Sequence, residues 1–140
     1  YSEATIKQEG SYSLKGIASI TASLNKTLTR TVSPTINLTD KTIIKFDIRA
    51  SRTGSNIKIG IHDSGGTTSE ITPNILAVDT WQTVVWDISA VANANKDVID
   101  SIIVTIVNAD AENTFYIDNM FADVIPGYYP AFRGRVGVFV

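Results

Sequence analysis

Apolar residues recur at every second position along most of this chain, in short runs that end at Gly, Pro, Asn, Asp or Ser. In the stretch KTIIKFDIRAS, Ile44, Phe46 and Ile48 alternate with charged residues. Successive side chains of a β-strand point to opposite faces, so this spacing puts the apolar set on one side and the charged set on the other. The period of 2 predicts antiparallel strands with one buried and one wet face.

Similar runs follow along the chain. NIKIGIHD (56–63) and WQTVVWDIS (81–89) alternate in the same way, while SIIVTIVNAD (101–110) is apolar on both faces, as expected in the middle of a sandwich. We expect the strand at 43–51 to pair with the strand at 56–63 as a hairpin. About eight or nine strands, with turn residues roughly every eight to twelve positions, predict one all-β antiparallel β-sandwich (jelly roll). We assign it to residues 1–125.

The charge of the chain excludes several partner classes. It has 12 Lys and Arg against 14 Asp and Glu, a net charge of −2. This balance gives neither the basic surface of a nucleic-acid-binding protein nor a polybasic membrane patch. No apolar run approaches the roughly 20 residues of a membrane-spanning helix, so we expect no membrane insertion. The absence of cysteine excludes disulfides and thiolate metal sites.

Four segments, in this order and at this spacing, resemble the galactose-binding-like jelly rolls, a superfamily that includes many bacterial carbohydrate-binding modules. They are EGSYSLKG (9–16), IIKFDIRAS (43–51), WQTVVWDIS (81–89) and TFYIDNM (114–120). The resemblance implies a non-catalytic carbohydrate-binding-like module of a larger extracellular or surface protein, with a glycan or polysaccharide as its partner. Family members usually carry one more N-terminal strand, so we expect an incomplete first edge in one sheet.

The same fold hosts unrelated functions, so a second interpretation stays open. In it the chain is a structural or assembly module, for example a virion or cell-surface component that binds no sugar. Aromatic side chains exposed on one face would favour the binding module. An apolar tail docked on a neighbouring subunit would favour the assembly module.

The chain contains few of the side-chain groups that usually carry out catalysis. His62 is the single histidine, and its neighbour Asp63 projects to the opposite face of a strand, so the two are not expected to form a dyad. No nucleophile elbow, phosphate-binding loop or zinc-binding HExxH motif is present. A glycosidase needs two carboxylates, so counting acidic residues leaves that route open. We expect a protein that is not an enzyme.

Asp118 stands alone among the apolar residues of TFYIDNM. In the resembling families an acidic residue of this strand and one near the first strands hold a structural Ca²⁺, and Asp118 and Glu9 are the matching positions. Two facing carboxylates would repel each other unless a cation lay between them. The alternative is that Asp118 accepts hydrogen bonds from backbone amides or pairs with a lysine such as Lys15.

A sugar-binding surface needs an aromatic ring for the C–H face of a pyranose and polar neighbours for its hydroxyl groups. Trp81 opens its strand after a turn, which places it at the rim of the sandwich, whereas Trp86 lies in mid-strand and is expected in the core. The outward residues of the expected hairpin supply the polar face. The predicted ligand-binding residues are His62, Arg49, Asp47, Lys58 and Trp81. An ordinary solvated sheet surface is the alternative.

Residues 126–140, PGYYPAFRGRVGVFV, depart from the family pattern. The proline and glycine residues separate them from the sandwich, and RVGVFV then alternates as a strand would. We expect a linker or an extra strand, in which residues 133–140 complete the unpaired edge of their own domain or that of a neighbouring copy. Donation between copies would give a homo-oligomer. A cloning remnant or the start of a following domain is the alternative.

Overall fold

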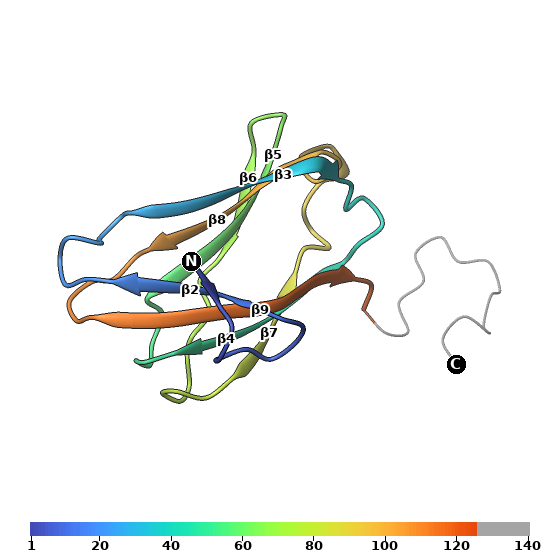
Figure 1. The fold of residues 1–140 in the computed structure, drawn as a ribbon. Coiled ribbons are helices and arrows are strands. Elements are labelled where there is room, and N and C mark those ends of the chain that lie inside the picture. The colour runs from blue at the N-terminus through green and yellow to red at the C-terminus, as the bar shows by residue number, and fades with distance from the viewer. Residues whose placement is uncertain (126–140) are drawn as a thin grey trace.

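The computed structural model of the chain describes residues 1–125, which form two antiparallel sheets stacked as a sandwich (Figure 1). Sheet A contains, in spatial order, β1 (Ser2–Glu3), β2 (Ser13–Ala18), β9 (Asn113–Asp123), β4 (Ile43–Ala50) and β7 (Gln82–Asp87). Sheet B contains, in spatial order, β3 (Thr27–Ile36), β8 (Ile99–Ile106), β5 (Ile57–Asp63) and β6 (Thr68–Ile71). A single 3-10 turn, η1 (Asn93–Asn95), is the only helical element in this part of the chain. The predicted antiparallel β-sandwich is confirmed.

The expected hairpin between β4 and β5 is wrong. β4 lies between β9 and β7 in sheet A, and β5 lies between β8 and β6 in sheet B, so the connection between them crosses from one sheet to the other. The alternation of apolar residues fixes which side chains face inward, but it does not fix the partner strand. Both strands have inward apolar rows, and these rows face each other across the core instead of lying side by side.

The core is formed by the inward rows that the sequence predicts. Phe46 and Ile48 of β4 and Ile59 of β5 are fully buried. Trp86 of β7 is 6% exposed and packs in the same cluster, which confirms the expectation for this residue. The β-branched and aromatic residues of these strands favour the pleated geometry that also buries them.

Two buried charged residues fasten the loops at the end of the sandwich where β8 begins. The Lys96 ammonium donates hydrogen bonds to the carbonyl oxygens of Lys41 and Ile88, each at 3.0 Å. The Asp63 carboxylate accepts hydrogen bonds from the amides of Gly65 and Val98, at 2.8 and 2.9 Å. Each buried charge therefore has backbone partners, as a buried polar group requires.

The first edge of sheet A is only partly covered, as the expectation of an incomplete first edge has it. The two-residue strand β1 covers part of β2 at the edge of sheet A. Within residues 1–125, the longest uncovered edge belongs to β3 in sheet B, where nine of the ten residues are exposed. The tail at 126–140 lies outside the described residues, as does the homo-oligomer contact predicted for 133–140. No helix within residues 1–125 has the length and apolarity needed to cross a membrane.

Gly16 supplies a test of the packing between β2 and β9. It pairs with Phe115, and a Cβ atom at Gly16 would overlap the Phe115 ring. We expect Gly16→Ala to lower the free energy of unfolding by about 1–3 kcal/mol through overpacking, measured by thermal unfolding. Phe115→Leu in the same chain should recover part of that loss. Losses that simply add in the double variant would contradict this account of the contact.

Candidate functional site

The outer face of sheet A carries a row of large side chains that crosses all its strands. The ladder aligns Lys15 of β2 with Tyr116 of β9, and Tyr116 with Arg49 of β4. Tyr1 lies opposite Lys15, because the backbone N–H and C=O of each residue bond to the other at 2.7 and 2.8 Å. Gln82 pairs with Ile48, so Trp81, one residue earlier, continues the row beyond Arg49. We call these five residues the aromatic–cation row.

Cations and rings alternate along this row. The Lys15 ammonium lies 5.4 Å from the centre of the Tyr1 ring and 5.5 Å from that of Tyr116, both within cation–π range. The rings of Tyr116 and Trp81 are 6.5 Å apart between centres and inclined at 60°, a favourable tilted arrangement. Arg49 occupies the register position between these two rings. Each long side chain is therefore held by a neighbour.

Both cations of the row also have a carboxylate partner. Lys15 lies 3.3 Å from Glu3, and the Arg49 guanidinium lies 3.3 Å from the Asp79 carboxylate and donates to the Asp79 carbonyl as well. The Tyr1 side chain, followed by Glu3 and Tyr116, raises the pKa of Lys15, which therefore stays charged. The Thr5 amide, followed by Lys15, lowers the pKa of Glu3. Together with Glu3 and Asp79, the row therefore presents charges of both signs and little net charge.

The rings of the row differ in exposure. Tyr1 is 65% exposed and Trp81 is half-buried, whereas Tyr116 is only 6% exposed beneath its neighbours. A hollow of about 210 Å³ lies beside Trp81, lined by Leu76, Ala77, Thr80 and Gln82. Two accessible aromatic surfaces therefore lie at opposite ends of the row, and Tyr116 supports the middle.

Asp47 lies beside this row but is not open to a ligand. It is 4% exposed, and its carboxylate accepts hydrogen bonds from the Thr83 hydroxyl at 2.6 Å and the Asn119 amide group at 3.1 Å. Asn119 has a positive φ of 50° at an irregularity in the β4–β9 ladder, which turns its side chain toward Asp47. Asp47 therefore ties three strands of sheet A together from the outer side.

Asp118 fastens the N-terminal loop to β9. Its Oδ2 accepts the backbone amides of Gln8 at 2.6 Å and Glu9 at 2.9 Å, and its Oδ1 accepts the amide of Asn119 at 2.7 Å. Partial burial raises the pKa of Asp118, but the three amides outweigh it, and the pKa lies below its ordinary value. Of the two expectations for this residue, the structure shows the one in which backbone amides are the partners.

This donor set fits Ca²⁺ poorly. The amide of Glu9, and not its carboxylate, contacts Asp118, and two N–H groups already occupy Oδ2. Calcium takes about six to eight oxygen ligands. Across residues 1–125 no group of three or more His, Asp or Glu side chains is arranged to hold a metal ion. The contacts of Asp118 do not add support for a calcium ion shared by Glu9 and Asp118, which stays a prediction from the resemblance alone.

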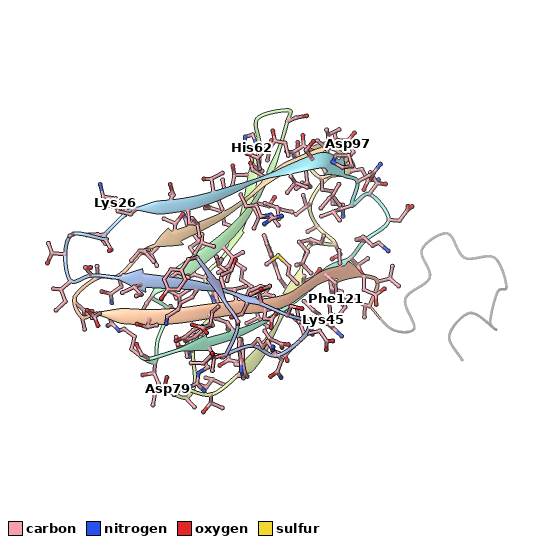
Figure 2. All side chains as sticks on the ribbon, in the orientation of Figure 1. Lys26, Lys45, His62, Asp79, Asp97 and Phe121 are labelled. Carbon is pink, nitrogen blue, oxygen red and sulfur yellow. The ribbon has the colours of Figure 1, made fainter. Side chains whose placement is uncertain are left out.

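The other two predicted ligand residues lie on the opposite side of the molecule. Lys58 and His62 project from β5 on the outer face of sheet B, where Lys58 pairs with Glu70 at 2.9 Å and His62 contacts Asp100 at 2.7 Å. The His62 hydrogen bond, followed by that of Ser101, lowers the pKa of Asp100. Figure 2 shows His62 and Asp79 on opposite sides of the sandwich.

The five predicted ligand residues therefore do not form one surface. Arg49, Asp47 and Trp81 belong to sheet A, and His62 and Lys58 to sheet B. The mistake follows directly from the expected hairpin, which would have placed β4 and β5 side by side. The sequence interpretation also did not assign Tyr1, Lys15 or Asp79 to the ligand surface. Their positions in the row depend on strand pairs that are distant in sequence.

The fold is shared with carbohydrate-binding modules. A family 30 carbohydrate-binding module is 14% identical over 88% of this chain and 83% of its own length, with a TM-score of 0.64. The family 11 module from Clostridium thermocellum, in complex with a β-1,3-1,4-mixed-linked tetrasaccharide, is 16% identical over 89% and 86%, with a TM-score of 0.61. An exo-β-agarase matches 90% of this chain through 22% of its own, at 15% identity and a TM-score of 0.63.

These likenesses define a β-sandwich of the carbohydrate-binding-module type, as the resemblance in the sequence implies. No protein-family model and no curated protein matches the chain.

The role of Asp118 predicts a pH-dependent contribution to stability. Its lowered pKa means that the contribution is complete above the unfolded pKa, about 3.9, and is lost as the pH falls through the folded pKa. We expect Asp118→Ala to lower the free energy of unfolding by about 1–2 kcal/mol at pH 7. The difference from wild type should shrink toward zero in acid. A constant difference across pH would contradict this role.

Calcium gives a second test at the same place. Because three backbone amides already donate hydrogen bonds to the two oxygens of the Asp118 carboxylate, we expect the melting temperature to be the same in EGTA and in millimolar Ca²⁺. An ion at 100 times its Kd would add about 2.7 kcal/mol, which is easily measured. A rise of that size, abolished by Asp118→Ala and by Glu9→Gln, would instead establish the cation site.

Proposed function

We propose that this chain is a non-catalytic carbohydrate-binding module and that the outer face of sheet A, around the aromatic–cation row, binds the glycan. The observation that carries this proposal is the pair of accessible rings, Tyr1 and Trp81, at the two ends of a row of fixed polar groups. The C–H face of a sugar ring packs on such an aromatic surface, while its hydroxyl groups bond to neighbouring charged groups.

The length of the row favours an oligosaccharide over a single sugar. It crosses five strands, and the spacing between neighbouring strands is about 4.8 Å, so its ends are about 19 Å apart. Lys15, Glu3, Arg49 and Asp79 lie between or beside the two rings. A chain of sugars laid across the strands would contact both aromatic ends and these four charged groups.

The charge of the aromatic–cation row favours a neutral glycan. Lys15 and Arg49 are each paired with a carboxylate, so neither cation of the row is uncompensated in the way that would attract a polyanion. Binding to a neutral oligosaccharide should therefore change little between about 50 mM and 500 mM NaCl, because screening acts on net charges. A strong preference for acidic polysaccharides, lost at high salt, would contradict this inference.

The carboxylates of this face support a role without catalysis. Asp47 and Asp118 are held by hydrogen bonds, and Glu3 and Asp79 by ion pairs. The pKa values of Glu3 and Asp118 are lowered, the opposite of what a general acid in glycoside hydrolysis requires. We therefore propose a binding function alone.

Attachment to a larger extracellular or surface protein completes the proposal. The exo-β-agarase supports it, because the matching part is only 22% of that chain. In such a protein the module would hold the neighbouring domains close to a polysaccharide.

A glycan array with the full chain, followed by affinity measurements on the glycan it selects, tests the function. We expect Tyr1→Ala and Trp81→Ala each to weaken binding about tenfold, equivalent to about 1.4 kcal/mol, with the fold verified by thermal unfolding. His62→Ala and Lys58→Ala on sheet B are the matched controls and should bind as wild type. Absence of any glycan binding would overturn the function. Weakening by the sheet B variants alone would move the site to the other face.

A further inference from the structure

An apolar groove runs along one side of the sandwich, where the edge of sheet B lies over sheet A. It consists of three hollows of about 120, 490 and 340 Å³ between β3–β8 and β2–β9. The first two hollows share Ile102 and Met120, and the second and third share Tyr1, Leu28 and Val104. The groove is therefore continuous from the end of β9 to the start of β3, and we call it the edge groove.

The lining of the edge groove is apolar and open. Leu28 and Ile36 of β3 pair with core residues of β8, and each is 43% exposed. Arg30, between them, is a polar part of the lining. Side chains that face the interior of a sandwich are normally covered by the opposite sheet. Their exposure here means that one more layer of side chains would fit on this side.

The strand that borders the groove also lacks a partner on one side. β3 pairs with β8 along one edge, and no strand in residues 1–125 pairs with its other edge. A long exposed edge of this kind presents free N–H and C=O groups that favour the addition of a strand. The groove and the free edge together call for an apolar β-strand.

We propose that the segment after Ile125 supplies this strand: Arg133 to Val140 pair with β3 as a fifth strand of sheet B, and Val136, Val138 and Val140 fill the edge groove. In RVGVFV these valines alternate with Gly137 and Phe139, so a strand turns all three to one side. The three valines therefore match the apolar lining of the edge groove.

The position of Ile125 is consistent with this occupant. Its amide donates to the Thr42 hydroxyl at 2.7 Å, near the end of the groove lined by Leu38 and Ile44. In Figure 1, β3 and β9 run in the same direction, so a chain that reverses after β9 runs antiparallel to β3. Residues 126–132 can span up to about 23 Å, more than the roughly 10 Å between stacked sheets.

Hydrogen exchange on the full chain tests the proposal, with Val138→Asp compared to Phe139→Asp. Both variants add the same charge, one toward the groove and one away from it. Among Thr27 to Val32, we expect the backbone amides that point away from β8 to exchange slowly in wild type and in Phe139→Asp, and about tenfold faster or more in Val138→Asp. The fluorescence of an apolar dye should rise in Val138→Asp and stay unchanged in Phe139→Asp. Val136→Asp provides a second variant with the same expected result.

Three results would overturn the proposal. Equal exchange and equal dye binding in wild type, Val138→Asp and Phe139→Asp would show that the segment does not occupy the groove. Fast exchange of those outward-pointing amides together with strong dye binding in wild type would show an open groove. Protection that disappears on dilution, with a mass above that of the monomer by light scattering, would show that a neighbouring copy donates the strand.

Discussion

The pairing of β4 with β9 is the interaction on which the rest of this molecule depends. It lies at the centre of sheet A, and its inner side places Phe46, Ile48 and Phe115 in the core. The same ladder aligns Arg49 with Tyr116 and Asp47 with Asp118 on the outer side. Loss of this register by one residue would exchange the two faces, so the core and the outer row form together or not at all.

The outer side of sheet A carries two sets of residues, one that fastens strands and loops and one that we propose binds a glycan. Asp47 and Asp118 accept hydrogen bonds from Thr83, Asn119 and the N-terminal loop, which fixes the strands and the loop in place. The neighbouring row keeps Tyr1 and Trp81 accessible and pairs its cations with Glu3 and Asp79. Preorganised side chains lose little conformational entropy when a ligand is bound. The fastening residues thus support the binding face proposed for this module.

The sequence predicted the sandwich and the inward rows well, because the alternation around Ile44, Phe46 and Ile48 directly records burial. The sequence did not predict which strands pair with one another. β4 and β5 are close in sequence but lie in different sheets, while two of the three amides that Asp118 accepts belong to a loop 109 or 110 residues earlier in the chain. Alternation describes one strand at a time, whereas a binding face depends on the register among strands that are distant in sequence.

An NMR titration of the full chain with the oligosaccharide selected by the glycan array tests the central claim most directly, because it locates the binding face without any substitution. We predict that the largest changes in amide chemical shift fall on Lys15, Arg49, Tyr116 and the residues around Trp81. Changes concentrated instead on β5 and β8, around His62 and Ser101, would contradict the assignment of the binding face to sheet A.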